Sequence, residues 1–527
     1  MPIDGRTIAQ GEILKTDVCI VGAGAAGITL AQAWDGAPFS VLLLDSGGFG
    51  EDSSIQSLSD GTTEASSFDC ESPYPFLESR VRCFGGTTTR WSGACIPLDA
   101  DDFLPKSWLR HSGWPFERSH LMPYYQRACE VLGIPEFPPA MPKESPFHQS
   151  PLETKVVCFS HPLDLGQKYK RQILRSPNIT LITYANVSQI ILDDGSSYVT
   201  RLEIKGFGDR SFTIEPRTVI LATGGIENAR LLLASNAQHP QGIGNHNDQV
   251  GRYFMEHIYQ VVGILPLHQR RQDAIFFTDV SSVGHTQALR TLGLTDTWRH
   301  QHRLLNLHLR FYRYTLLEDT EAVIFAKQLQ VAALDRQKRF GEMIRGGKLW
   351  RDGWTVLPRY LGWHFWNKLD RKARFDHVRL SGWIEQEPDP ENRITLSRTR
   401  DKLGQPLAHL KLHFSDLMQD SVMRSLEHMS KILYTRGFGQ LEYNPERLNH
   451  LAPYNKMGLH HMGTTRMHPN PHYGVVDANS KVHNVDNLFI AGSSIFPTGG
   501  AANPTLTIVA LALRLGDRIY RFYTDSR

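Results

Sequence analysis

The chain has 527 residues, which is more than one compact domain usually holds, so we expect two interleaved domains or one large α/β domain with an insert. Hydrophobic residues make up 41% of the sequence and charged residues 21%, as in an ordinary globular protein. The formal net charge of +3 gives no bulk attraction to nucleic acid, and the sequence has no run of about 18 apolar residues that predicts a membrane span.

The beginning of the chain predicts where the protein is located, and the spacing of its cysteines and histidines bears on metal binding. Residues 1–14 include Asp4 and Glu12 and lack an apolar stretch, so we expect no signal peptide and a cytoplasmic location. The six cysteines form no C-x-x-C pair, and the spacing of His468 and His472 cannot be helical because two prolines stand among residues 469–471. The sequence therefore predicts no metal site.

The first recognisable unit is a strand, a glycine-rich turn, a helix and a second strand. Thr16–Val21 is an apolar strand, Gly22–Gly27 reads GAGAAG, Ile28–Trp34 is typical of a helix, and Val41–Leu44 is a second apolar strand. This arrangement of about 30 residues is the one that binds dinucleotides. The unit alone does not separate FAD from NAD.

Four residues of this unit have roles that follow from its geometry. Gly22 allows the tight turn, Gly24 lets the backbone approach a pyrophosphate, and Gly27 lets the helix pack closely on the strand. Asp45, which ends the second strand, is placed to accept a hydrogen bond from a ribose hydroxyl.

Two further glycine-rich blocks are expected beside the same ligand. Cys83–Gly93 joins paired glycines to three threonines, which lets the backbone press against a flat ligand while hydroxyl groups reach its polar edge. Thr218–Leu221 is a buried strand followed by Ala222–Gly225 and a helix over Glu227–Ser235, which brings a second helix N-terminus to the sheet edge.

The pattern changes in the middle of the chain. Arg303–Tyr314 and Val378–Glu385 alternate as antiparallel strands do, which predicts a substrate domain over 256–449. Glu385 and Gln386 are its candidate substrate contacts. Residues 320–374 predict a basic, tryptophan-rich helical insert that could lie on a membrane, form an oligomer interface or pack on the protein's own core.

The last block carries the candidate chemistry. Asn487–Ala491 predicts a strand that ends at Gly492 and Ser493, and Pro504 suits the first position of an apolar helix over 506–515. Asn503 would then be the cap of that helix, although a capping side chain is not free for a substrate. A histidine poised near neutral pH is the natural base for alcohol oxidation, and His460 and its neighbour His461 are rivals because adjacent residues of an extended segment face opposite ways.

These blocks together resemble the glucose-methanol-choline (GMC) flavin oxidoreductases. The resemblance covers Thr16–Gly48, Gly85–Phe103, Val219–Ser235 and Gly458–Asp517. It is greatest to the branch of pyranose 2-oxidase, bacterial glycoside 3-oxidases and sugar dehydrogenases, in which a His–Asn pair maps to His460 and Asn503.

The resemblance implies an α/β fold, α+β overall, of the GMC and p-hydroxybenzoate hydroxylase type. A Rossmann-like FAD-binding domain, residues 1–255 plus 450–527, would be interleaved with the substrate domain built on an antiparallel sheet. Covalent pyranose 2-oxidases carry a histidine where this chain has Arg90, so the resemblance implies non-covalent FAD, with Ser92 near flavin N5. The expected FAD-binding residues are Gly22, Gly24, Ala25, Ala26, Gly27, Asp45, Ser46, Arg82, Gly86, Thr87, Trp91, Ser92, Val187, Ala222, Thr223, Gly224, Gly492, Ser493, Asn503, Pro504 and Thr505.

The function that follows is oxidation of a hydroxyl on a sugar, glycoside or aminoglycoside-like molecule, with His460 as base, Asn503 as donor and His461 as a further substrate contact. Oxygen or another electron acceptor would take the electrons, and the sequence is compatible with an oligomer. Two alternatives stay open: a GMC-type lyase that uses no redox chemistry, and a dehydrogenase subunit that passes electrons to a cytochrome or membrane partner.

Overall fold

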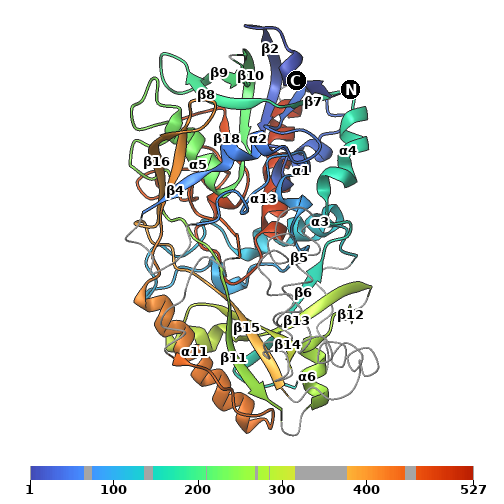
Figure 1. Cartoon of the computed structure of the whole chain (residues 1–527), viewed down its shortest axis with the longest axis vertical. Helices are drawn as coiled ribbons and strands as arrows, with labels where there is room; N and C mark the ends of the chain where they lie inside the picture. The colour runs from blue at the N-terminus through green and yellow to red at the C-terminus, as the bar shows by residue number, and fades with distance from the viewer. Residues whose placement is uncertain are drawn as a thin grey trace, which may run out of the picture.

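The computed structural model describes residues 2–64, 74–135, 146–208, 210–267, 271–283, 285–314, 377–445 and 458–525. A largely parallel sheet lies in the upper part of Figure 1, near both chain ends, and an antiparallel sheet lies in the lower part. The predicted tryptophan-rich insert at 320–374 falls outside the described residues. Within the described residues no helix has the length and apolar character needed to cross a membrane.

The elements follow one another along the chain as mixed helices and strands. The strands are β1 (Ile3–Asp4), β2 (Ile13–Val21), β3 (Val41–Leu44), β4 (Gly61–Thr63), β5 (Ala94–Cys95), β6 (Leu152–Phe159), β7 (Ile179–Thr183), β8 (Asn186–Leu192), β9 (Val199–Lys205), β10 (Ser211–Leu221), β11 (Ile258–Pro266), β12 (Ser281–Val283), β13 (Thr286–Leu294), β14 (Leu307–Tyr314), β15 (His377–Ile384), β16 (Arg393–Arg400), β17 (Pro406–Lys411) and β18 (Leu488–Ile490). The α-helices are α1 (Ala25–Ala33), α2 (Ser53–Gln56), α3 (Met122–Leu132), α4 (Leu165–Arg175), α5 (Gly224–Ala234), α6 (Arg271–Thr278), α7 (Asp296–His302), α11 (Asp416–Thr435) and α13 (Thr505–Asp525).

The first sheet brings strands from both ends of the chain together. Its order in the described residues is β1-β7-β3-β2-β10-β9-β8, with β18 paired to β10. All pairs from β1 to β10 and the pair with β18 are parallel, whereas β9 and β8 add an antiparallel hairpin. The carboxyl ends of β2, β3, β10 and β18 therefore meet at one edge, where open α/β sheets bind ligands.

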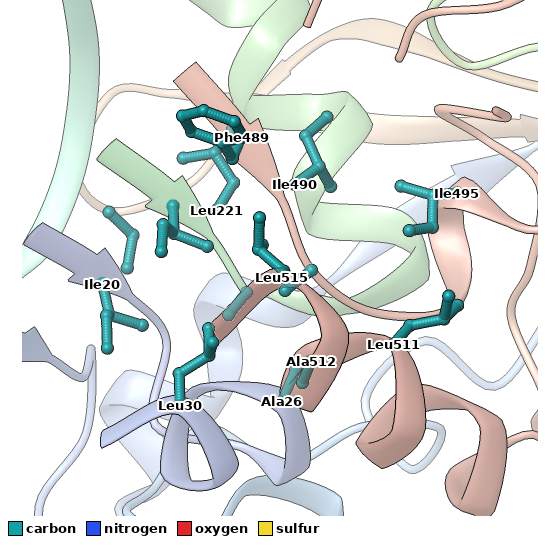
Figure 2. Close-up of a cluster of buried hydrophobic side chains, with 14 of the residues drawn as sticks. Ile20, Ala26, Leu30, Leu221, Phe489, Ile490, Ile495, Leu511, Ala512 and Leu515 are labelled. Atoms are coloured by element: carbon teal, nitrogen blue, oxygen red, sulfur yellow. The ribbon is translucent and has the colours of Figure 1, made fainter. Parts of the chain in front are cut away.

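The core of this region is formed by strand residues packed on two helices (Figure 2). Ile20 of β2, Leu221 of β10 and Ile490 of β18 are fully buried next to Leu30 of α1 and Leu515 of α13. Burying each such side chain stabilises the fold by about 1.5–3 kcal/mol. The apolar sequence over 506–515 thus forms the start of a buried helix, as predicted, and α1 begins at Ala25 rather than at Ile28.

The second sheet is antiparallel, with the order β11-β15-β14-β13-β6-β5 among the described strands and β12 beside β13. β14 and β15 are antiparallel strands, as the alternating pattern predicted, and the structure pairs them with each other. β5 and β6, however, lie within residues 1–255, which the sequence analysis assigned to the FAD-binding part. Helix α11 covers this sheet with an apolar stripe at intervals of three or four residues: Met418, Val422, Leu426, Met429 and Leu433.

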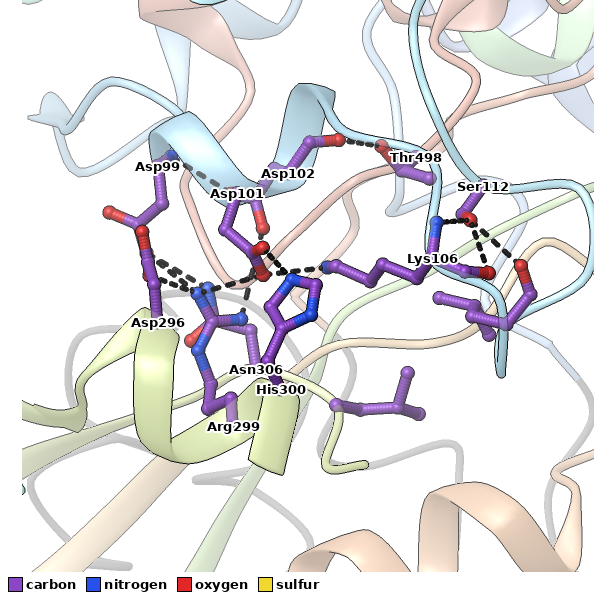
Figure 3. A network of polar contacts seen from close by, with 12 residues as sticks. Asp99, Asp101, Asp102, Lys106, Ser112, Asp296, Arg299, His300, Asn306 and Thr498 are labelled. Carbon is purple, nitrogen blue, oxygen red and sulfur yellow. Dashed lines mark hydrogen bonds and ion pairs between the residues drawn. The ribbon is translucent and has the colours of Figure 1, made fainter. Parts of the chain in front are cut away.

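A buried charge network joins α7, beside the antiparallel sheet, to the segment around the 3₁₀ helix η5 (Ala100–Phe103) (Figure 3). Arg299 is 1% exposed and binds Asp296 at 2.6 Å, Asp101 at 3.5 Å and Asp99 at 3.7 Å. Lys106 binds Asp101 at 3.0 Å. Although burial opposes its charge, Lys155, His308 and Arg299 hold the pKa of Asp99 well below its usual range.

We expect Arg299→Leu to lower the stability of the protein by about 3–5 kcal/mol, because it removes a buried guanidinium that lies within 4.0 Å of Asp99, Asp101 and Asp102. The thermal unfolding midpoint, followed by far-ultraviolet circular dichroism, measures the loss. Arg424→Leu is the matched control, since Arg424 pairs with Asp420 at the surface and such pairs contribute about 0–1 kcal/mol. Equal midpoints for the two variants would show that the network does not stabilise the fold.

Candidate active site

A cavity of about 500 Å³ lies at the edge where the parallel strands end. Gly22 follows β2, Asp45 follows β3, Ala222 follows β10 and Gly492 comes two residues after β18, and all four line it. The same cavity extends to His460 and to Trp383 of β15. It therefore connects the edge of the parallel sheet with side chains of the antiparallel sheet.

The turn between β2 and α1 fits the phosphates of a dinucleotide. A Cβ on Gly27 would lie 1.9 Å from the Gly22 carbonyl oxygen, so only glycine lets α1 approach this closely. A Cβ on Gly24 would meet no atom of the described residues within 4 Å, which leaves its backbone open to the cavity. The free N–H groups and positive end of α1 lie at the same place.

Asp45 lies where a ribose hydroxyl was predicted to bind, and its carboxylate already has two backbone donors. Ala23 N donates to one oxygen at 3.0 Å and Gly47 N to the other at 2.8 Å. Burial raises the pKa of Asp45 to about 6. An ionised carboxylate has about four acceptor sites, so capacity remains for a hydroxyl donor.

The structure gathers nearly all the expected FAD-binding residues around this cavity. Gly27, which packs α1 on the strand, is the one expected residue that does not line it. Those that do are Gly22, Gly24, Ala25, Ala26, Asp45, Ser46, Arg82, Gly86, Thr87, Trp91, Ser92, Val187, Ala222, Thr223, Gly224, Gly492, Ser493, Asn503, Pro504 and Thr505.

An arginine–glutamate cluster in the cavity wall was not predicted beyond Arg82. Glu227 binds Arg80 at 2.7 Å, Arg82 at 2.7 Å and Arg230 at 3.2 Å. Although burial opposes its charge, these three guanidinium groups hold the pKa of Glu227 far below its usual range. Arg80 and Glu227 come from segments 147 residues apart, so no local pattern could have indicated the pair.

His460 and Asn503 lie side by side at the edge of the cavity. The Asn503 amide nitrogen, Nδ2, is 3.5 Å from Nε2 of His460. The first hydrogen bond of α13 runs from Ile508 N to Pro504 O at 2.9 Å, so Pro504 is the cap residue. The prediction that Asn503 caps the helix is wrong by one residue, which leaves its amide beside His460.

Two further aromatic side chains complete the surroundings of His460, and neither was predicted from the sequence. Trp383 stacks on the His460 ring, with centroids 5.2 Å apart and planes at 19°. His257 places its Nδ1 2.9 Å from Nδ1 of His460. Burial, reinforced by His257 and His461, holds the pKa of His460 well below its usual range, so the imidazole is neutral at neutral pH.

The rival base, His461, also lines the cavity but points toward Glu256. Its Nε2 lies 3.7 Å from a Glu256 oxygen, and its ring packs near Tyr74 and Phe254. Burial lowers the pKa of His461 to about 3. His460, not His461, is therefore the histidine next to Asn503.

The two candidate substrate residues on the antiparallel sheet are not brought to the cavity. Glu385 is 1% exposed and accepts from Asn306 N at 2.7 Å. Gln386 is 2% exposed and accepts from Glu256 N at 2.9 Å. Both side chains hold backbone groups in the interior. No group of three or more potential metal ligands is found among the described residues.

The comparisons with known proteins agree with this geometry. A family model described as GMC oxidoreductase matches residues 388–512. The fructose dehydrogenase large subunit of Gluconobacter japonicus is 24% identical over 97% of this chain and 98% of its own length. Paromamine 6'-oxidase of Streptomyces fradiae is 24% identical over 94% of this chain and 90% of its own length.

A solved structure shows the same fold. The formate oxidase of Aspergillus oryzae RIB40, from a study of FAD modification, superimposes with a TM-score of 0.55 at 17% identity, over 98% of this chain and all of that one. The strand-end cavity, the glycine turn and these likenesses lead to one conclusion: residues 388–512 match the GMC oxidoreductase family, and the chain is an FAD-dependent enzyme that acts on CH–OH groups.

Proposed function

We propose that this enzyme oxidises a hydroxyl group of a sugar, glycoside or aminoglycoside to the carbonyl, with His460 as general base and Asn503 as hydrogen-bond donor. The observation that supports this most is the His460–Asn503 pair, a base and an amide 3.5 Å apart at the cavity that also contains the dinucleotide turn. When bound, FAD supplies the acceptor for the hydride that leaves the substrate carbon.

The residues of the chain handle the proton and the substrate oxygen. His460 is neutral, so Nε2 can take the proton of the substrate hydroxyl as the C–H bond breaks. The Asn503 amide donates to the same oxygen and fixes its orientation. Pro504 and Thr505 bring the positive end of α13 to the cavity, where it stabilises negative charge that develops on the cofactor side.

A sugar is the substrate class that best suits the wall beside the base. The Trp383 ring stacks on His460 and packs on Tyr259 with centroids 4.5 Å apart, and these contacts hold an aromatic side chain of the cavity wall next to the proposed base. The full-length relatives are named for fructose and for paromamine, both of which carry rings with several hydroxyl groups.

The test is anaerobic. The purified holoenzyme is mixed with fructose, glucose, alkyl glucosides, paromamine and simple alcohols, and the absorbance of oxidised flavin is followed. We expect bleaching by at least one ring sugar, and readmitted air then separates an oxidase, whose colour returns at once, from a dehydrogenase. Bleaching by simple alcohols alone would refute the substrate class, and a substrate consumed without bleaching would indicate a lyase.

FAD should be released intact when the holoenzyme is precipitated with acid. Arg90, at the position of the flavin-linking histidine, is no nucleophile, and its side chain is held in a two-point ion pair by Glu51. The supernatant should contain the full amount of FAD by mass spectrometry. Flavin that stays with the precipitated protein would show a covalent link and contradict this prediction.

Replacing His460 with alanine should slow anaerobic flavin reduction by about 100-fold or more, because no group then accepts the hydroxyl proton. The variant should remain yellow, since the FAD-binding residues are untouched. Stopped-flow absorbance measures the rate at saturating substrate. His472→Ala, a change at an exposed histidine, is the control and should keep the full rate; full activity in His460→Ala would refute the base assignment.

Trp383→Ala should raise the KM for the best ring sugar by about 10-fold, because it removes an aromatic contact of about 1.4 kcal/mol. Trp383→Phe, which keeps a ring, should recover most of the affinity. Steady-state kinetics with a sugar and with a small primary alcohol make the comparison. A parallel rise in KM for both substrates would show that the tryptophan does not recognise a ring.

A further inference from the structure

His257 occupies the position behind the proposed base, and both of its ring nitrogens have a partner. The side chain is fully buried. Nε2 lies 2.7 Å from the Gly500 carbonyl oxygen, and Nδ1 lies 2.9 Å from Nδ1 of His460. The two imidazole rings are perpendicular, with centroids 5.1 Å apart.

The Gly500 carbonyl determines where the protons lie in this chain of contacts. A carbonyl oxygen can only accept, so the hydrogen of His257 must be on Nε2. Burial lowers the pKa of His257 to about 4, so the ring is neutral and its Nδ1 is an acceptor. His460 must then donate from its own Nδ1, which leaves Nε2 of His460 with a free lone pair. This assignment rests on the hydrogen-bond network.

The opposite tautomer of His460 would disable the site. A hydrogen on Nε2 would leave no lone pair on the nitrogen that faces Asn503 and the cavity, and would set two N–H donors against each other. Two Nδ1 lone pairs would also meet at 2.9 Å on the His257 side. The contacts at Nδ1 and at Nε2 of His460 therefore favour the same tautomer, with the hydrogen on Nδ1.

We propose that His257 is a positioning residue that fixes His460 as the Nδ1–H tautomer and so keeps Nε2 free to accept the substrate proton. The inference rests on the proposed function, in which His460 is the base. His257 touches neither substrate nor cofactor in this role, since it is not among the residues that line the cavity.

The surrounding structure holds both histidines and the carbonyl in place. Glu256 accepts from His257 N at 3.0 Å and from His460 N at 2.5 Å with the same oxygen. Gly458 N donates to the His257 carbonyl at 2.8 Å. Gly500 has φ +52°, and a Cβ there would lie 2.3 Å from Asp102, so the backbone that presents the carbonyl depends on glycine.

Three titratable groups of the described residues act on the pair. Glu256 and His461 lie on the same two segments, and His308 of β14 disfavours the charged form of His257. Burial raises the pKa of Glu256 to about 7, and its carboxyl accepts from the backbone N–H groups of His257 and His460, which the His257 variants keep. A difference between wild type and a His257 variant therefore isolates the effect of His257.

The experiment compares His257→Leu with His257→Asn in the FAD-loaded enzyme. Leucine removes the acceptor, whereas the asparagine Oδ1 replaces Nδ1. Flavin reduction at saturating substrate should fall by at least about 10-fold in the leucine variant and recover largely in the asparagine variant. His409→Leu, which removes a partly buried histidine bonded to Thr62 in another sheet, controls for general destabilisation.

The pH profile separates positioning from a purely structural role. A charge on His257 disfavours a charge on His460, so removing the imidazole of His257 raises the pKa of His460. The acid limb of flavin reduction should therefore move to higher pH in both variants, whereas only His257→Asn, which keeps an acceptor for the Nδ1 hydrogen, should recover the rate. An unchanged rate and limb in His257→Leu, or equal slowing of both variants with the wild-type limb, would overturn the proposal.

A measurement on the unmutated protein covers the case in which a variant fails to fold. In protein labelled with ¹⁵N-histidine, the signals lost in His460→Ala should show a protonated Nδ1 and an unprotonated Nε2. A protonated Nε2 would overturn the inference. Full activity in His460→Ala would instead refute the proposed function, so the two failures are distinguishable.

Discussion

The buried carboxylate of Glu256 ties together the two segments on which the candidate chemistry depends. One of its oxygens accepts from the backbone of both His257 and His460, which are 203 residues apart, and the other accepts from Tyr74 at 2.9 Å. Met255 and Met462 add a pair of backbone hydrogen bonds beside it. These bonds fix the backbone that carries both histidine rings. The contact between the rings therefore costs little further conformational entropy.

The site around His257 also depends on the buried charge network of Arg299, because Asp102 of that network lies beside Gly500. Asp102 packs against Gly500, whose carbonyl binds His257, and its own carbonyl accepts from Thr498 at 2.7 Å. Arg299 and Lys106 supply the positive charge that keeps these acids at a depth where an unpaired carboxylate is very costly. The position of the Gly500 carbonyl is thus linked to packing between the two sheets.

The sequence predicted what is local and missed what is distant. Strand, glycine turn and helix are adjacent in the chain, so Gly22–Gly27 could be identified from spacing, whereas most of the other residues that line the cavity were expected from the resemblance to the GMC family. His257 and Trp383 meet His460 only through tertiary packing, and a lone histidine or tryptophan carries no pattern. Glu385 and Gln386 looked like substrate contacts on a strand, yet they are buried and hold backbone groups, because a single sequence does not show which face of a strand is covered.

A neutral histidine behind the base solves a problem that a carboxylate would create. An aspartate or glutamate bonded to Nδ1 of His460 would favour the imidazolium and raise its pKa, so that a buried base could rest in its protonated, inactive form. His257, whose Nε2 donates to the Gly500 carbonyl, accepts the same hydrogen bond from Nδ1 of His460 but carries no fixed negative charge. His460 is then held in one tautomer while burial keeps it neutral, and its positive charge arises only once it has taken a proton from the substrate.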